Sequence, residues 1–127
     1  MKAQELRIGN WVNYVFEDKD WGNVIMDGNG IVRLANINFD STHYAKKEIF
    51  SPIPLTEEWL TRFGFRHKKT EKANSYTKYF FMINFVTEGR YKGKTFIKVA
   101  NFKPDINNFL YVHQLQNLYY ALTGEEL

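Results

Sequence analysis

The feature that most restricts the fold is an alternation of apolar and polar residues that starts at Phe65 and continues to about residue 102. A period of two is typical of antiparallel strands with one buried face. We expect strands from Phe65, over residues 76–85 and over residues 95–102. In the middle strand, the odd-numbered side chains are predicted to form the buried face. A basic hairpin loop between the last two strands is predicted by two glycines, Gly89 and Gly93.

The first part of the chain also predicts β-structure. Residues 6–16 are rich in β-branched and aromatic side chains and predict a strand. Gly9 and Asn10 interrupt this pattern, so we expect a bend there. Residues 21–26 predict a second strand.

The tetrapeptide DGNG at residues 27–30 tolerates positive φ angles and therefore predicts a tight hairpin turn. Residues 31–39 then predict a third strand with a bulge, and residues 48–51 predict a short closing strand. Several short strands joined by tight turns are typical of a small SH3-like barrel, which we expect over residues 1–51.

A short helix is predicted immediately after this unit. Pro52 and Pro54 cannot continue a central strand and mark the exit from the N-terminal unit. Thr56 is a favourable N-cap for a helix over residues 56–63, and Gly64 is placed to end it in the left-handed conformation.

A longer helix is predicted at the C-terminus, over residues 110–122 after a turn at residues 104–108. Helical spacing places five side chains on one buried stripe: Val112, Leu115, Leu118, Tyr119 and Leu122. Four others are predicted to form the opposite, polar face: His113, Gln116, Asn117 and Tyr120. Gly124 is a natural terminator.

Together these elements predict an α+β fold. It consists of an N-terminal SH3-like β-unit, a short helix, an antiparallel β-sheet and a C-terminal amphipathic helix packed against that sheet. A chain of 127 residues matches one compact domain. Within residues 1–127 we expect two subunits of that domain, an SH3-like β-subunit at 1–51 and an α-β-β-β-α subunit at 52–127.

The composition of the chain indicates the cellular compartment in which the protein is expected. The chain has no cysteine, which excludes disulfides and thiol nucleophiles and fits a reducing compartment. No apolar run approaches the roughly 20 residues of a membrane-spanning helix. The first residues also lack the apolar stretch of a signal peptide, so we expect a cytoplasmic protein without a membrane partner.

Charge is unevenly distributed along the chain. Residues 1–60 carry a net charge of −3, whereas residues 61–127 carry +6. All 11 basic residues of the second part lie between Arg62 and Lys103, together with only two acidic residues, so this stretch carries +9. Such a field attracts phosphates or an acidic protein face. The alternative interpretation is an ordinary solvated surface whose lysines balance the acidic half.

The sequence does not contain a recognisable catalytic constellation. None of the three histidines, His43, His67 and His113, has a second histidine or a carboxylate at i+4 on a predicted helix, as a zinc pair requires. Ser41 and Asp40 adjoin His43, but adjacency in sequence is not the geometry of a catalytic triad. We therefore expect a protein that is not an enzyme and that uses no metal or cofactor.

One segment partly matches the signature of RNA-recognition domains. In residues 92–99, Lys92, Gly93, Phe96 and Ile97 fit the pattern. Lys94 and Val99 stand where that signature has aromatic residues, so some of the rings that stack on bases are replaced.

Three segments resemble a family of small, largely uncharacterised proteins encoded by bacteriophages and prophages. They are LRIGNWV at residues 6–12, PIPLTEEWL at residues 52–60 with FGF at 63–65, and YVHQLQNLYYALTGEEL at residues 111–127. The resemblance implies a phage accessory protein located in the host cytoplasm. Small phage proteins of this kind often bind and redirect host machinery, including defence systems.

From the charge and the resemblance we expect a binding protein. The leading hypothesis is a host protein or ribonucleoprotein as partner, with anti-CRISPR or other anti-defence activity as the specific case. The alternatives are a sequence-tolerant RNA or single-stranded DNA binder and a structural phage component; the oligomeric state is left open. The predicted binding surface consists of basic residues interleaved with aromatic ones: Arg62, Arg66, Lys68, Lys69, Lys72, Tyr76, Phe80, Arg90, Tyr91, Lys92 and Lys94.

Overall fold

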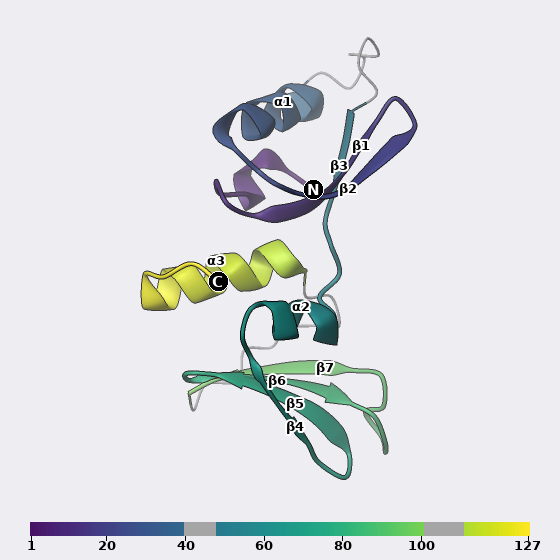
Figure 1. Ribbon diagram of the computed structural model, residues 1–127, viewed down its shortest axis with the longest axis vertical. Coiled ribbons are helices and arrows are strands. Elements are labelled where there is room, and N and C mark those ends of the chain that lie inside the picture. The colour runs from purple at the N-terminus through teal and green to yellow at the C-terminus, as the bar shows by residue number, and fades with distance from the viewer. Residues whose placement is uncertain (40–47, 101–110) are drawn as a thin grey trace. The chain divides into compact units, whose positions relative to one another are not determined.

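Figure 1 shows a computed structural model of the chain, in which residues 1–39, 48–100 and 111–127 are described. The predicted α+β class is confirmed, because helices accompany two antiparallel sheets. The contacts divide the chain into two units, one formed by Met1–Pro54 with Tyr111–Leu127 and the other by Leu55–Leu110. The C-terminal helix is thus grouped with the N-terminal residues, whereas the sequence predicts it within a 52–127 subunit. The single domain stays a prediction.

The first unit contains a three-stranded antiparallel sheet with the order β2-β1-β3. A 3-10 turn over Ala3–Glu5 precedes β1 (Trp11–Phe16) and β2 (Lys19–Ile25), which confirms the first two predicted strands. The predicted closing strand is confirmed as β3 (Glu48–Ser51), which pairs with β1. The predicted bend is also present, since Gly9 has a φ of +96° before β1 begins.

The third strand is replaced by a helix, α1 (Gly28–Phe39), so the predicted hairpin turn at residues 27–30 and strand at 31–39 are wrong. Asp27 caps this helix. Its Oδ1 accepts a hydrogen bond from the Gly30 N–H at 2.7 Å, and its carbonyl accepts one from the Ile31 N–H at 3.1 Å. Asp27 is therefore a helix N-cap and not the first residue of a hairpin turn.

The apolar side chains of α1 follow a helical stripe. Ile31, Leu34 and Ile37 are spaced three residues apart and pack against the core of the first unit. Leu34 is 3% exposed, whereas Val32, two residues earlier, is 59% exposed. Within the described residues, this unit therefore combines three strands with α1, and the SH3-like barrel stays a prediction.

The second unit contains a helix and a four-stranded antiparallel sheet. After α2 (Glu57–Arg62), the sheet has the order β4-β5-β6-β7. Its strands are β4 (Arg66–Lys69), β5 (Ala73–Lys78), β6 (Phe81–Val86) and β7 (Thr95–Val99). The predicted strand at 76–85 is in fact parts of two strands, because the chain turns at Tyr79, which has a φ of +52° and is 75% exposed.

The caps of α2 are those that the sequence predicts. Thr56 is the N-cap, and its hydroxyl accepts a hydrogen bond from the Trp59 N–H. Gly64 has a φ of +82°, and the Phe65 N–H donates to the Leu60 carbonyl at 3.0 Å. This bond is the six-to-one bond of a Schellman motif, which requires a left-handed residue before it. Local signals alone therefore set both ends of this helix.

The C-terminal helix, α3 (Val112–Thr123), is confirmed, and Gly124 ends it with a φ of +74°. Val112, Leu115 and Tyr119 of the predicted stripe are buried, while Leu122 is 50% exposed and Leu118 is half-buried. The prediction of an exposed polar face is wrong at His113 and Gln116, which are 1% and 2% exposed. The turn predicted at residues 104–108 lies outside the described residues.

Gln116 is buried because its side chain hydrogen-bonds the bend before β1. Its Oε1 accepts from the Trp11 N–H at 2.9 Å, and its Nε2 donates to the Gly9 carbonyl at 3.1 Å. The buried Asn10 extends the network by donating to Asn117 Oδ1 at 3.0 Å. These amides satisfy backbone groups at the bend, which explains how polar residues are accommodated inside the first unit.

His113 is buried without a hydrogen bond to either ring nitrogen. Burial lowers the pKa of His113 below 6.5, the carboxylate of Glu5 at 3.7 Å from Nε2 partly offsets this effect, and the N-terminal amine lowers the pKa further.

Acidification is therefore expected to destabilise the fold through His113. Because the pKa is lower in the folded chain than in the unfolded chain, the unfolded chain binds more protons as the pH falls below about 6.5, and the free energy of unfolding decreases. Urea unfolding at pH 7.5 and at pH 5.5 measures this change, with His113→Gln as the control. An equal loss of stability in wild type and His113→Gln would contradict a role for this histidine.

Candidate nucleic-acid interface

The sheet of the second unit has one face covered by α2 (Figure 1). Tyr76, Phe81 and Ile83 on this face are 5%, 1% and 0% exposed. The Lys78 Nζ donates to the carbonyl of Phe63, the C-cap of α2, at 2.7 Å. Burial, followed by the nearby carboxylate of Glu57 in α2, raises the pKa of Tyr76 above 10. This face is therefore the core side of the unit.

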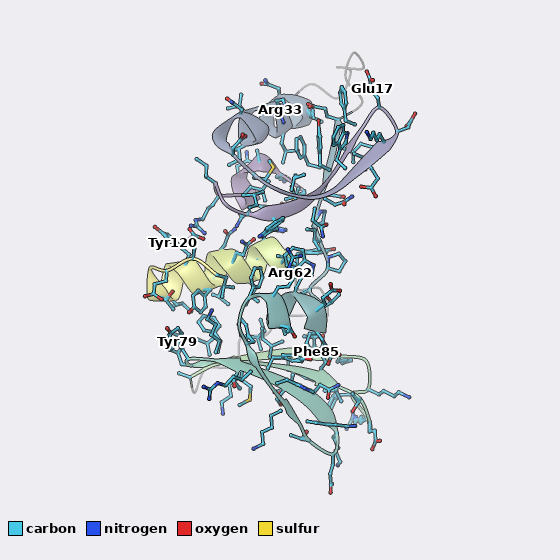
Figure 2. The ribbon with its side chains drawn as sticks, viewed as in Figure 1. Glu17, Arg33, Arg62, Tyr79, Phe85 and Tyr120 are labelled. Carbon is cyan, nitrogen blue, oxygen red and sulfur yellow. The ribbon has the colours of Figure 1, made fainter. Side chains whose placement is uncertain are left out.

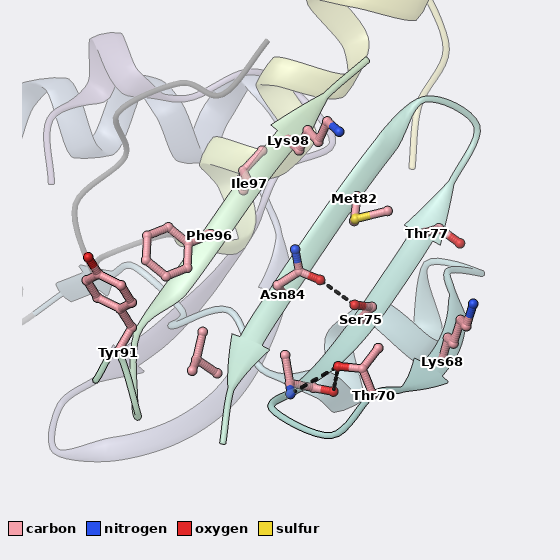
Figure 3. Close-up of a pocket in the computed structure, with 12 residues that line it drawn as sticks. Lys68, Thr70, Ser75, Thr77, Met82, Asn84, Tyr91, Phe96, Ile97 and Lys98 are labelled. Carbon is pink, nitrogen blue, oxygen red and sulfur yellow. Dashed lines mark hydrogen bonds between the residues drawn. The ribbon is translucent and has the colours of Figure 1, made fainter. Parts of the chain in front are cut away.

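The opposite face of the same sheet, here called the open face, is hollowed into a groove of about 840 Å³ (Figure 3). Because side chains alternate along a strand, the open face carries the residues between the core positions. The groove is lined by Lys68, Thr70, Ala73, Ser75, Thr77, Met82, Asn84, Val86, Tyr91, Phe96, Ile97 and Lys98.

One row of the open face crosses all four strands. Lys68 of β4 pairs with Ser75 of β5, Ser75 pairs with Asn84 of β6, and Asn84 pairs with Phe96 of β7. Directly opposed side chains on one sheet face lie about 5 Å apart at their Cβ atoms. The row therefore places a cation, a hydroxyl, an amide and an aromatic ring in sequence across the groove.

The hydrogen bonds inside the groove involve the oxygen of the Asn84 amide but not its nitrogen. Ser75 Oγ donates to Asn84 Oδ1, as Figure 3 shows. Thr70 Oγ1 bonds both the N–H and the carbonyl of Ala73 and is thus satisfied. Among the described residues, the Asn84 Nδ2 has no hydrogen-bond partner, so its two N–H groups are available to a ligand.

Two aromatic rings stand at one end of the groove. Tyr91 and Phe96 are 48% and 43% exposed, and their rings meet edge to face with centroids 5.8 Å apart. The charged groups of Arg90 and Lys94 each lie 5.7 Å from the Tyr91 ring. Exposed rings surrounded by cations are the combination on which nucleic-acid bases stack.

A second, smaller hollow of about 240 Å³ continues the groove. It shares Thr77, Met82 and Lys98 with the groove and adds Phe80, which is 44% exposed. The two hollows together extend the open face from the β6–β7 loop to the β5–β6 turn.

The structure brings together only part of the predicted surface. Lys68 and Tyr91 line the groove. Arg66 pairs with Thr77, so it lies on the same face of β4 as Lys68. Phe80 lines the adjoining hollow, and Arg90 and Lys94 lie beside Tyr91. Lys72 and Lys92 are exposed in the turns at the ends of the strands.

Three predicted residues lie elsewhere. The assignment of Tyr76 to a binding surface is corrected, because it is buried on the core face and stacks on His67. Arg62, labelled in Figure 2, lies in the last turn of α2, the helix that covers the core face of the sheet. Its guanidinium is 4.3 Å from the Trp59 ring. Lys69 is exposed, but strand alternation places it on the opposite side of β4 from Lys68.

Of the twelve residues that line the groove, the predicted binding surface contains only Lys68 and Tyr91; the residues it omits include Ser75, Asn84, Phe96 and Lys98. The signal that could have located them is the turn at Tyr79 and Phe80. A two-residue turn there pairs Thr77 with Met82 and places residues 75, 77, 82 and 84 on one face. The partial RNA-recognition signature already contained Phe96 as a matching aromatic residue.

The described residues hold no group of three His, Asp or Glu side chains that could bind a metal ion. His113 has no hydroxyl or amide partner, and His43 lies outside the described residues. None of the helices described is long and apolar enough to cross a membrane.

Comparison with known proteins adds no relative. The chain matches no protein-family model, no curated protein and no solved structure. The resemblance to phage-encoded proteins therefore stays a prediction.

Proposed function

We propose that this chain is a non-enzymatic binding protein whose open face takes a single strand of RNA or DNA. The observation that carries the proposal is the row across the sheet in which Lys68, Asn84 and Phe96 lie on one exposed face. Cations contact phosphates, an aromatic ring stacks on a base, and an amide contacts the edge of that base. A single strand supplies all three partners at once.

The charge of the unit supports this choice of partner. The stretch between Arg62 and Lys103 carries +9. Arg62 and Lys69 lie off the open face, but most of the other cations lie on it or at its edges, and phosphates are drawn to such a charge without any requirement for sequence. An acidic protein face would satisfy the cations equally well, but it would leave the exposed rings of Tyr91 and Phe96 without the stacking partners that bases provide. Single-stranded nucleic acid therefore fits the open face better than a protein does.

The resemblance to phage-encoded proteins gives this activity a biological setting. We propose host ribonucleoproteins as the source of the bound strand, because they carry single-stranded RNA segments in the cytoplasm. Inhibition of a CRISPR complex through its guide RNA is the specific case. A host protein as direct partner and a structural role in the phage particle are the competing outcomes of the tests.

Reversing the charge of Lys68 tests the proposal, because Lys69 provides a matched control on the other side of the same strand. Lys68→Glu is expected to weaken binding of a fluorescent single-stranded RNA or DNA roughly tenfold at about 50 mM salt, since one lost phosphate contact changes the salt slope by about 0.7. Lys69→Glu makes the same change in net charge and should weaken binding much less. Fluorescence anisotropy across a salt series measures both.

Each result of this experiment has a definite meaning. Equal weakening by both variants would show that binding depends only on net charge and not on the open face. No binding of either nucleic acid by the wild-type protein would refute the proposal. A host protein captured by the wild type in the presence of nuclease, and lost with Lys68→Glu, would favour the protein partner instead.

A further inference from the structure

The row across the open face also contains a group that can discriminate between bases. The Asn84 side chain is directly opposite Phe96 in the β6–β7 register. A base that stacks on Phe96 and extends over the neighbouring strand therefore reaches Asn84. The edge of that base therefore meets the Asn84 amide, and Lys68 lies further along the same row. Stacking and hydrogen bonding thus act on the same nucleotide.

The orientation of the Asn84 amide determines whether the edge of the stacked base must present hydrogen-bond acceptors or donors. Ser75 Oγ donates to Asn84 Oδ1, which directs the amide oxygen toward β5 and leaves Nδ2 as the group available to the base (Figure 3). Lys98, which also lines the groove, can only donate hydrogen bonds. The centre of the groove is therefore rich in donors.

Pyrimidines suit a site rich in donors better than purines do. The Watson–Crick edge of uracil or thymine presents two acceptors, O2 and O4, and that of cytosine also presents two, O2 and N3. Adenine presents only N1 on this edge, and guanine presents only O6. Bases in single strands are commonly read on this edge.

We propose that Asn84, held by Ser75, makes the open face selective for pyrimidines. This inference rests on the proposed function, since it concerns the same groove and the same single-stranded ligand. It goes beyond that function in that Asn84 confers a base preference on a surface whose phosphate contacts are independent of sequence.

Oligonucleotides of equal length and different base test this inference. Oligo-U and oligo-C are expected to bind the wild-type protein about fivefold more tightly than oligo-A, the effect of one hydrogen bond made or lost. Asn84→Ala should reduce this ratio. The part that remains reflects the cost of unstacking oligo-A, whose bases stack on one another in the free strand. Asn84→Asp keeps the shape of the side chain but replaces the donors with acceptors, so it should shift the ratio towards oligo-A.

Two controls separate base selection from overall affinity. Lys68→Gln should weaken all three oligonucleotides by the same factor and leave their ratio unchanged. Ser75→Ala should retain the pyrimidine preference in part, because the donors of Asn84 remain. A thermal melt of each variant confirms that the unit is folded.

The outcomes distinguish this inference from the function on which it rests. If all three oligonucleotides bind and Asn84→Ala leaves their ratio unchanged, the selectivity is overturned while nucleic-acid binding stands. A preference for oligo-A that disappears in Asn84→Ala would show that the amide presents its oxygen, which also overturns the inference. If no oligonucleotide binds, the proposed function itself fails.

Discussion

Leu34→Ala is expected to lower the free energy of unfolding by about 2–5 kcal/mol, the usual cost of truncating a buried leucine. Leu34 is 3% exposed on α1 and belongs to the core that Val12, Met26 and Phe50 form in the first unit. Alanine is the best helix former, so the loss comes from packing and not from helix propensity. Urea unfolding monitored by circular dichroism measures the change.

Val32→Ala is the matched control because Val32 lies on the same helix and is 59% exposed. Its replacement should change the free energy of unfolding by no more than about 0.5 kcal/mol. In a strand, Val32 and Leu34 would share one face and both substitutions would be costly. Similar losses for the two variants would therefore contradict the helix, and a small loss for Leu34→Ala would contradict the core.

The sequence predicts best those elements whose signals are local. Thr56 and Gly64 delimit α2 because an N-cap oxygen and a left-handed residue act within one turn of the helix. The closing strand β3 (Glu48–Ser51) was predicted with the bounds that the structure shows. For α2, the residues that decide the conformation are close neighbours in the chain, whereas β3 also depends on its pairing with β1.

At residues 27–39, a short apolar pattern led to the wrong prediction of a strand in place of α1. The segment Asp-Gly-Asn-Gly tolerates the positive φ of a hairpin turn, but Asp27 is also a strong N-cap. The apolar residues at 32, 34 and 37 fit strand and helix periods almost equally over nine residues. The decision comes from the core of the first unit, which Ile31, Leu34 and Ile37 contact together.

Long-range partners explain the error on α3. By composition alone, His113 and Gln116 belong on a polar face. Gln116 is buried because its amide bonds Gly9 and Trp11, which are more than 100 residues away in sequence. Such pairing is visible only once the fold is known, although both partners fall in the segments that carry the phage resemblance.

The positive charge of the candidate site was predictable from the sequence, but the face of the sheet on which each residue lies was not. The basic stretch is evident in the sequence, yet the turn at Tyr79 and Phe80 decides which alternate side chains point away from α2. Treating residues 76–85 as one strand placed Thr77 with the core and Tyr76 on the surface. The structure reverses both assignments, since Tyr76 is buried and Thr77 lines the groove.

Phe96→Ala is expected to weaken binding of single-stranded nucleic acid by about 1–3 kcal/mol, which is roughly 5- to 150-fold in Kd. Loss of the ring removes the stacking surface at the end of the row that contains Asn84. The substitution should affect folding little, because Phe96 is 43% exposed. Fluorescence anisotropy with one oligonucleotide, together with a thermal melt, separates the two effects.

Two further substitutions show whether the ring acts by stacking. Phe96→Leu keeps an apolar side chain but no aromatic face, so it should lose nearly as much affinity as Phe96→Ala. Phe96→Trp should retain binding, and base stacking should quench its fluorescence. Trp21→Ala removes an exposed ring, 54% exposed, from β2 in the other unit and should leave affinity unchanged. Full binding by Phe96→Leu would show that the groove recognises its ligand without stacking, and the phosphate contacts of Lys68 would then have to account for the affinity.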